Sequence, residues 1–397
     1  MKNIPFYIYA FTVWYCVMIG TEAWFTWNYR NTELTLLLTL GIGLFQITNT
    51  QAFNSKTSSS IKIAFLLLLV AFYSLSNGTL GIQLILKTYL VWSICCLKHS
   101  YKYKLFKIIQ RSTTILLIPS LIIHYVLLFI HLPPIGGIIE HPSSINYVFE
   151  NYIFLLTNSL MYEDRFCGFT LEPGYIGSFC AFMLYADKFR LKKIENITFL
   201  LAIITSLSLA GYILTIMGLF MCRISNIKLL LKRLIQTVIL IFCIFYISQW
   251  YNNGDNLINE KIVERLKVDN EKGIKGNNRV SDEVDDYYNQ FLRSDNLLFG
   301  YSPKQMKKLR NSVTTWSSTG YKTFLMDYGL LRMILVLLFY YIIAKTSNDK
   351  YYSMGFFFII TIYFLAAGYI YSLMWLIIYV IGIQLNTNTL INRKQNN

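Results

Sequence analysis

Long apolar runs recur along the whole chain, and they restrict the folds that it can adopt. Most are long enough to cross the hydrocarbon core of a bilayer as a helix. Only 14% of the 397 residues are charged, whereas about a quarter are charged in a typical soluble domain. The runs are Ile4–Gly20, Glu33–Thr48, Ile61–Leu75, Thr79–Leu97, Ile115–Leu132, Cys167–Ala186, Leu229–Tyr251, Tyr321–Ala344, Tyr352–Ala367 and Gly368–Ile383. They predict an all-α, polytopic membrane protein.

The stretch Ile197–Cys222 is also apolar, but it is too long for one comfortable span and short for two. Ser206, Ser208 and Gly211 interrupt it. A single span here would move the basic cluster Arg223–Arg233 to the outer side, so we interpret the stretch as two short, tilted helices. The chain then has roughly 12 transmembrane helices.

The charges favour an orientation with both termini in the cytoplasm. The segments assigned to the inner side hold 20 basic residues and three acidic ones (Asp187, Glu195 and Asp349), a net charge of +17. The rest of the chain carries −2, which recovers the total of +15. Loops rich in Lys and Arg stay in the cytoplasm, so we expect a multi-pass protein of the inner (cytoplasmic) membrane. The positive charge reflects topology and does not indicate nucleic-acid binding.

Five regions follow from this topology. Transmembrane helices are expected in an N-terminal part (residues 1–132), a central part (167–251) and a C-terminal part that ends in a cytoplasmic tail (321–397). Residues 133–166 form an outer loop, in which we consider an interfacial helix around Ile145–Leu160. Residues 252–320 form a large extracytoplasmic loop. The 11 basic and 10 acidic residues of the large loop are interspersed, which favours a folded or partly helical cap. Phosphate-binding loops and Cys/His clusters are missing from the sequence, so we expect no metal and no soluble cofactor.

Arg165 and the triplet Glu172-Pro173-Gly174 lie where a predicted span begins. Proline suits the first turn of a helix, where its missing N–H costs nothing. Glycine permits the close approach of a ligand or of another backbone. Glu172 is expected at the lipid–water boundary, on the same side as Arg165. The structural alternative is a helix cap with a surface ion pair.

The span after the large loop is also unusual, because it contains polar and charged residues at near-helical spacing. They are Tyr321, Lys322, Asp327 and Arg332. Charges inside a span are costly and usually face a cavity or a partner. The structural alternative is an Asp327–Arg332 pair that satisfies itself. Lys87 lies about 12 Å down its helix from Thr79, too deep for its ammonium to reach either surface. It therefore needs a counter-anion or water, supplied by the protein or by a ligand.

Four sequence elements follow one another in a recognisable order. They are Arg165…Gly168…Glu172-Pro173-Gly174, the serine-rich Ser206–Ile213, Arg279 followed by Leu298-Phe299-Gly300, and the sequence Asp327-Tyr328-Gly329. In this order they resemble the O-antigen and capsular repeat-unit polymerases, which are related to the O-antigen ligases. The resemblance extends from Arg165 to the C-terminal spans, and the first third of the chain matches only in hydropathy.

The resemblance implies a GT-C-like membrane fold and a glycosyltransferase that needs no metal. The donor is a growing glycan on undecaprenyl diphosphate, and the acceptor is one repeat unit on the same lipid. A hydroxyl of the acceptor's terminal sugar attacks the donor's anomeric carbon, and undecaprenyl diphosphate leaves. The partners are therefore these two lipid-linked glycans and the bilayer, with a chain-length regulator as a further candidate.

Fixed cations are needed where the diphosphate leaves, and arginine matches phosphate geometry. We assign Arg165 and Arg279 to the diphosphates, although Arg279 is one of 11 basic residues in its loop. Glu172 either deprotonates the attacking hydroxyl or orients Arg165, and we favour the second role. The remaining candidates for substrate binding are Lys87, Tyr321, Lys322, Asp327 and Arg332.

Other classes of protein remain open. The ligases carry a functional histidine in their large outer loop, but residues 252–320 contain none, which favours the polymerase and leaves a general base unassigned. A polysaccharide flippase would show repeated halves, and we find none. A membrane scaffold would not account for Lys87, Glu172 and Asp327 at or within spans.

Overall fold

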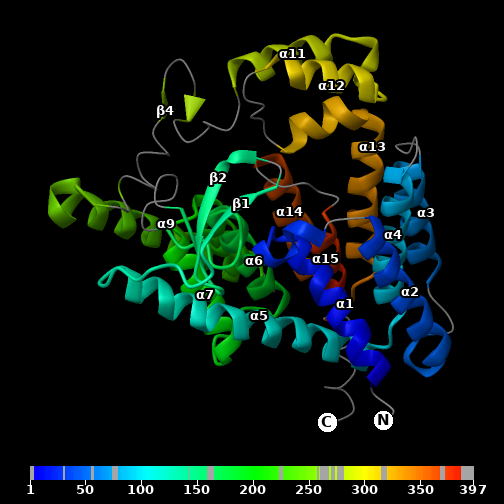
Figure 1. The fold of residues 1–397 in the computed structure, drawn as a ribbon, viewed down its shortest axis with the longest axis horizontal. Helices are drawn as coiled ribbons and strands as arrows, with labels where there is room; N and C mark the ends of the chain where they lie inside the picture. Colours follow the sequence, from blue (N-terminus) through cyan, green and yellow to red (C-terminus); the bar gives the residue numbers. More distant parts are fainter. Residues whose placement is uncertain are drawn as a thin grey trace.

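The computed structural model describes residues 4–29, 32–54, 58–73, 79–142, 144–158, 165–222, 227–256, 259, 268–269, 273–274, 281–313, 320–366 and 372–385. Over these ranges the protein is mostly helical, at 77%, with 14 α-helices (Figure 1). Within the residues whose side chains are described, only α5 (His99–Leu127) and α13 (Gly320–Lys345) are long and apolar enough to cross a membrane by length and composition. In eight further apolar helices the described portion is 10–17 residues long.

The helices follow the predicted apolar runs closely. The first part of the chain forms α1 (Ile4–Gly20), η1 (Trp24–Tyr29), α2 (Thr32–Thr48), η2 (Thr50–Ala52), α3 (Ser59–Tyr73), α4 (Thr79–Cys96) and α5 (His99–Leu127). The central part forms α6 (Pro173–Ala186), α7 (Ile194–Ser206), α8 (Leu209–Met221) and α9 (Ile227–Trp250). Two helices, α7 and α8, therefore share the stretch Ile197–Cys222, as expected.

Helix α5 begins 16 residues before the predicted run at Ile115. Its first turns are amphipathic, because Leu105, Phe106 and Ile109 are buried while the neighbouring basic side chains stay at the surface. Lys102 is the exception, and its Nζ donates to the Cys95 carbonyl at 2.8 Å. Polar residues on one face of a helix lower the mean hydropathy but not the helical period, so the start of α5 was missed.

The helical piece considered around Ile145–Leu160 is wrong, because this region is a β-sheet. Strands β1 (Ile138–His141), β2 (Ser144–Asn151) and β3 (Leu156–Thr157) form an antiparallel sheet in the order β1-β2-β3. Val148 is exposed whereas Phe149 is buried against Trp27. Side chains that alternate in this way have the period of a strand.

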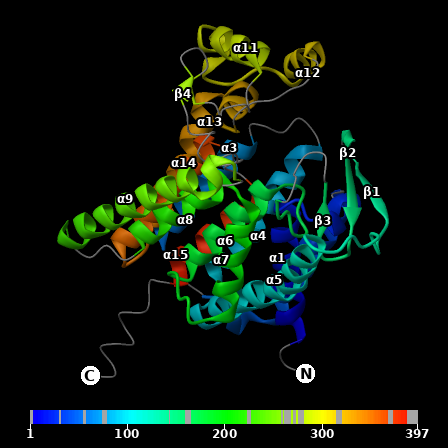
Figure 2. The same cartoon turned by 90° about the vertical axis from the view of Figure 1, so that its left-hand side faces the viewer.

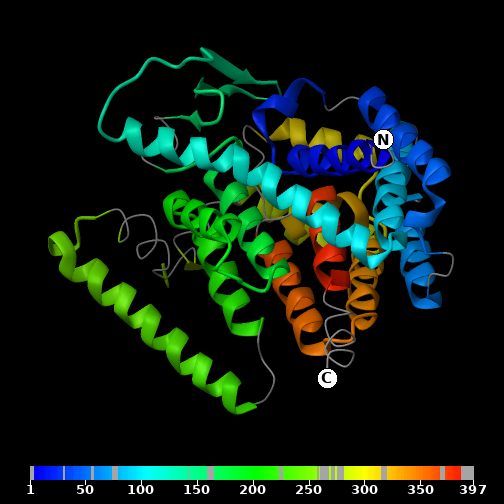
Figure 3. The ribbon, with the colours of Figure 1, turned by 90° about the horizontal axis from the view of Figure 1, so that it is seen from below.

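The core of the bundle is built around α15 (Leu373–Leu385), which is buried along almost its whole length. It lies against α1, α4, α5 and α6, while α13 (Gly320–Lys345) packs beside α3 and α14 (Lys350–Ala366). α5 runs across α1, α7 and α15 (Figures 1 and 3). α9 contacts α8 and extends away from the other helices (Figures 2 and 3).

The described part of the large loop is a small helical cap. It comprises β4 (Val268–Asp269), β5 (Gly273–Ile274), α11 (Asp282–Leu292), η5 (Asp295–Leu297) and α12 (Pro303–Ser312). The helices α11 and α12 lie above the start of α13 (Figure 1). Val284, Phe291 and Met306 form an apolar cluster with Leu325 and Met326 of α13. The cap is thus attached to the bundle by its own small core.

Two glycines connect the cap to α13 by direct backbone contact. Gly329 bends α13 with φ 79° and ψ 168°, a conformation open almost only to glycine. A Cβ added there would lie 2.4 Å from the Leu298 carbonyl oxygen, and one at Gly300 would lie 2.7 Å from the Tyr328 nitrogen. The Tyr301 N–H donates to Met326 O at 2.7 Å, so the two segments are hydrogen-bonded as well. The elements Leu298-Phe299-Gly300 and Asp327-Tyr328-Gly329 therefore form one joint.

Gly329→Ala is expected to break this joint. The new Cβ would clash with backbone atoms and would need a strained φ, so we expect a loss of at least about 2 kcal/mol of unfolding free energy. Gly41→Ala is the control, because nothing lies within 4 Å of its Cβ position. The measurement is thermal unfolding of the purified protein. Equal midpoints for the two variants would contradict the joint.

Candidate functional site

Arg165 caps the end of a helix at the tip of the α7–α8 hairpin. Its Nε donates to the Ser206 carbonyl at 3.3 Å, and one terminal nitrogen donates to the Leu207 carbonyl at 3.2 Å. Leu207 has the left-handed conformation that ends α7. The last carbonyls of a helix lack partners within the helix, and a basic side chain can supply them. Arg165 is thus fixed at a place where backbone polar groups need donors.

The hairpin tip touches α6 through two glycines. A Cβ at Gly211 would lie 3.0 Å from the Gly177 Cα, and one at Gly177 would lie 2.8 Å from the Ser208 Cβ. Ser206 and Ser208 are buried, and their hydroxyls bond within the tip, with Ser208 Oγ accepting from the Gly211 N–H at 3.2 Å. The predicted serine-rich element is therefore in contact with the start of the Glu-Pro-Gly helix.

Glu172 is the N-cap of α6, with Pro173 in the first turn as predicted. Its side chain forms no cap hydrogen bond. Among the described residues its carboxylate also forms no ion pair, so the expected contact that would orient Arg165 is not seen. Gly177 is five residues further along, about 7 Å at the α-helical rise. Glu172 hence lies one to two turns from the hairpin tip that Arg165 caps.

The loop between Arg165 and Glu172 is joined to the segment after α1. Ala23 and Thr170 form an antiparallel bridge, and the Trp24 N–H donates to Phe169 O at 3.0 Å. The Thr170 hydroxyl also lies within hydrogen-bond distance of the Cys167 and Glu172 carbonyls, at 2.8 and 3.0 Å. Phe166, Cys167 and Phe169 are buried. The loop is thus a fixed part of the core.

Lys87 lies on α4 and is partly buried. In the described part of the chain it forms no ion pair or hydrogen bond, and Cys16 of α1 is the titratable group that interacts with it. Cys16 is four residues before the end of α1, about 6 Å. Lys87 therefore lies on the α1 side of the bundle, below the segment that meets Thr170, and its counter-anion stays a prediction.

Tyr321 and Lys322 face the cap. The Lys322 ammonium pairs with Asp285 of α11 and lies 5.1 Å from the ring centroid of Tyr288. Tyr321 packs edge-to-face on the same Tyr288 ring, with centroids 6.0 Å apart. Burial raises the pKa of the Tyr288 phenol, with the Tyr321 and Asp285 charges adding to the effect, so this ring is neutral at physiological pH. These contacts give both residues a structural role in holding the cap.

The alternative of a self-satisfying Asp327–Arg332 pair is wrong. Asp327 accepts from a terminal nitrogen of Arg310 in α12, at 2.8 and 3.0 Å to its two oxygens. Arg332 donates to the carbonyls of Phe299 and Tyr328, both at 3.2 Å. The spacing of the two residues suggested a pair, but the bend at Gly329 turns them toward different partners.

The described candidates thus fall into separate places. Arg165 and Glu172 lie at the α6–α7–α8 contact, Lys87 lies beside α1, and the remaining four, Tyr321, Lys322, Asp327 and Arg332, lie beneath the cap. Arg279 is outside the described residues. In the described part of the chain, no group of three or more His, Cys, Asp or Glu side chains gathers to hold a metal ion.

Sequence reasoning missed two pairs next to these places. Arg310 was only one basic residue among many, and its partnership with Asp327 depends on how the cap folds. Glu22 and His141 approach to 3.9 Å, with His141 edge-to-face on Trp27 at 4.7 Å. The left-handed φ of 58° at Glu22 turns the chain after α1 toward the sheet. No sequence signal links residues so far apart along the chain.

Removing the Arg310 partner of Asp327 tests the attachment of the cap. The Asp327 side chain is only 17% exposed, so Arg310→Ala leaves a largely buried carboxylate without its ion pair and should cost about 1–2 kcal/mol. Adding Asp327→Asn should recover part of this loss. Lys304→Ala on the same helix is the control and should stay within about 0.5 kcal/mol. Unfolding midpoints measure all three variants, and equal effects of Arg310→Ala and Lys304→Ala would contradict the attachment.

Comparison of the chain with protein-family models, curated proteins and solved structures finds no match in any of the three. The function of the site therefore has to be argued from its own chemistry.

Proposed function

We propose that this protein joins oligosaccharide repeat units carried on undecaprenyl diphosphate into a surface polysaccharide, at the outer side of the cytoplasmic membrane. In this proposal it is a glycosyltransferase with roughly 12 membrane spans and a GT-C-like fold. The acceptor sugar hydroxyl attacks the anomeric carbon of the donor, its proton is taken up by a base, and the lipid diphosphate leaves with the bonding electrons.

The fixed position of Arg165 carries the proposal. Its guanidinium is held at the hairpin tip beside the start of α6, whose N-cap has no side-chain cap bond. The N-terminus of a helix attracts anions, and a guanidinium has five N–H donors, so a side chain that caps two carbonyls can still donate to a phosphate. Two positive elements thus lie within one to two helical turns of each other in an apolar bundle, which suits the departure of a diphosphate.

In this proposal the site lies within the bilayer, because the helices that carry it are shorter than a hydrocarbon core is thick. α6 has 14 residues and α7 and α8 have 13 each, which corresponds to about 20 Å against a hydrocarbon core of about 30 Å. If their far ends lie at the cytoplasmic surface, Arg165 and Glu172 lie about 10 Å below the outer one. Irregular backbone at that depth is tolerated where it is buried in protein or lines a wet cavity. Such a recess suits a diphosphate whose lipid tail stays between helices.

Contacts between distant segments support the topology. Each acidic residue counted on the inner side pairs with an inner basic residue. The pairs are Asp187 with Lys193 at 2.6 Å, Asp349 with Lys188 at 3.1 Å, and Glu195 with Lys107 at 3.9 Å and Arg111 at 3.7 Å. Segments assigned to the outer side also contact one another, because Ala23 and Thr170 form an antiparallel backbone bridge.

The long α5 fits this topology if its basic first turns lie at the cytoplasmic surface. It starts among inner residues and ends close to the outer ones, because His124 contacts Phe166 at 5.3 Å and the Tyr152 hydroxyl bonds to Leu132 O at 2.9 Å. Its 29 residues span about 43 Å, which exceeds a core of about 30 Å, so the basic first turns can stay at the cytoplasmic surface while the apolar remainder crosses.

The two expected roles of Glu172 are not equally supported. Orienting Arg165 would need a contact that its carboxylate does not make among the described residues. A base needs an accessible carboxylate within reach of the acceptor hydroxyl, and Glu172 is partly exposed. We therefore propose Glu172 as the base and Arg165 as the cation that stabilises the leaving diphosphate, with Arg279 of the large loop assisting.

Charge removal at Glu172 and Arg165 tests these roles. Glu172→Gln keeps the shape of the side chain but removes the proton acceptor, so chain growth should fall at least about 100-fold. Arg165→Ala should have a similar effect, because a phosphate contact is lost. Polymer length on gels is compared with the amount of protein in the membrane. The controls are Glu140→Gln and Arg293→Ala, both at exposed positions. Polymer of normal length from both Glu172→Gln and Arg165→Ala would contradict the assigned roles.

Cysteine labelling in spheroplasts tests the topology separately. Cys243 is the exposed thiol among the described cysteines, so it is first replaced by serine. In this Cys243→Ser background, Lys304→Cys should react with a membrane-impermeant thiol reagent without lysis. Lys192→Cys should react only after the membrane is opened. Labelling of both, or of Lys192→Cys alone, before lysis would contradict the orientation.

A further inference from the structure

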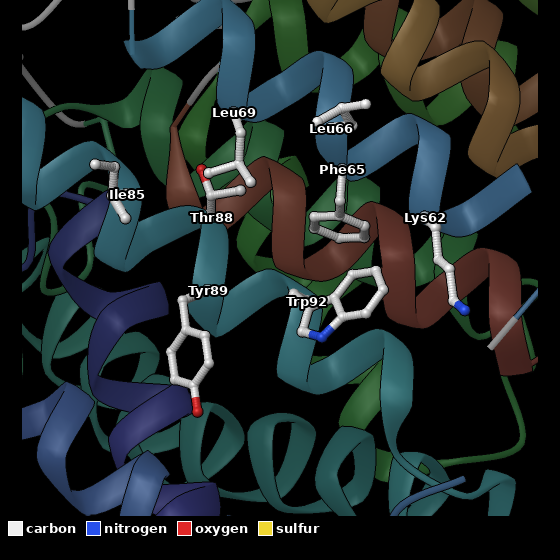
Figure 4. A pocket seen from close by; sticks show the side chains of 8 residues that line it. All are labelled: Lys62, Phe65, Leu66, Leu69, Ile85, Thr88, Tyr89 and Trp92. Carbon is white, nitrogen blue, oxygen red and sulfur yellow. The ribbon is translucent and has the colours of Figure 1, made fainter. Parts of the chain in front are cut away.

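A groove runs between α3 and α4 on the outside of the bundle. It has a volume of about 360 Å³, and one face of each helix lines it. Lys62, Phe65, Leu66 and Leu69 come from α3, and Ile85, Thr88, Tyr89 and Trp92 come from α4 (Figure 4). Both sets follow the spacing i, i+3, i+4, i+7 of one helix face. None of the predicted site residues lines this groove.

The floor of the groove is fixed and its rims are open. Phe65 and Thr88 are buried, and the Phe65 ring packs edge-to-face on Trp92 at 5.0 Å and on Phe339 of α13 at 5.2 Å. Leu66 and Ile85 at the rims are 61% and 38% exposed. Exposed leucine and isoleucine beside a preformed apolar hollow suit an acyl chain better than water.

The cation of the groove lies at one end. Figure 4 shows Lys62 at that end and Ile85 at the other, with the Trp92 indole beside Phe65 between them. In the described part of the chain, Lys62 forms no ion pair and the Trp92 N–H forms no hydrogen bond. Tyr89 differs, because its hydroxyl donates to Gln46 of α2. The groove is thus apolar along most of its length, with the Lys62 cation at one end and the Trp92 N–H part-way along.

This polar end lies away from the cap. Phe65 contacts Phe339, which is ten residues beyond the bend at Gly329, about 15 Å along α13. Lys62 is a further turn toward the start of α3. The charge pattern assigns that end to the cytoplasm, where lysine and tryptophan are found at the level of lipid headgroups.

We propose that the α3–α4 groove binds an anionic phospholipid of the cytoplasmic leaflet, with its phosphate at Lys62 and an acyl chain along Phe65, Leu66 and Ile85. The proposal rests on the membrane insertion that the proposed function requires. Lipid tails are as apolar as leucine, so the groove itself gives little preference among lipids. Selectivity for an anionic headgroup has to come from the charge of Lys62.

Lipid competition on the full-length protein tests this. Phosphatidylglycerol and phosphatidylcholine with identical acyl chains are titrated, and bound lipid is counted by native mass spectrometry. The wild type should prefer phosphatidylglycerol about fivefold for its tightest site, the effect of one interfacial lysine. Lys62→Ala should remove the preference, whereas Lys232→Ala, an exposed lysine of α9, should keep it.

A second variant tests the groove independently of the charge. Leu66→Trp should fill the hollow and release the tightest lipid, while the unfolding midpoint stays unchanged because Leu66 is exposed. Equal binding of the two lipids by the wild type, or a preference that survives Lys62→Ala, would overturn the proposal. The lipid titration does not measure polymer growth, so equal binding of the two lipids would leave the glycosyltransferase proposal standing. Conversely, the lipid preference can still be measured if the protein proves not to be a glycosyltransferase.

Discussion

Irregular backbone in an apolar bundle needs a partner for each polar group, and this requirement shapes the centre of the structure. The turn at Leu207 leaves carbonyls at the end of α7, and Arg165 donates to two of them. The loop up to Glu172 is bonded to the segment after α1 and to itself. Close contact of Gly177 and Gly211 brings these pieces together. A cation is thereby fixed beside a helix N-terminus, which is the arrangement that the proposed chemistry uses.

The cap depends on a second place where backbone meets backbone. Gly300 and Gly329 let the loop after η5 lie directly on the bend of α13, and the ion pairs of Lys322 and Asp327 surround that contact. Charged residues in α13 therefore serve to attach the cap as well as to shape the space below it. The backbone contact connects two short sequence elements that are 29 residues apart, and it requires a glycine in each.

The helices were predictable because most of them are long, nearly continuous apolar runs with few charges. The sheet around Phe149 was not, since short strands with a polar face carry a weak signal. Side-chain partners were least predictable. Asp327 pairs with Arg310 because the bend at Gly329 redirects it, and the approach of Glu22 to His141 depends on contacts between segments more than 100 residues apart.

The most direct test of the central claim uses a strain that lacks this gene, with its lipid-linked glycans resolved on a gel. The account predicts that the ladder of polymer collapses to a single repeat unit at the outer face, and that the wild-type gene restores it. Intact long chains left on the carrier lipid would contradict it and indicate a ligase. Single units retained on the inner face would contradict it in another way and indicate a flippase.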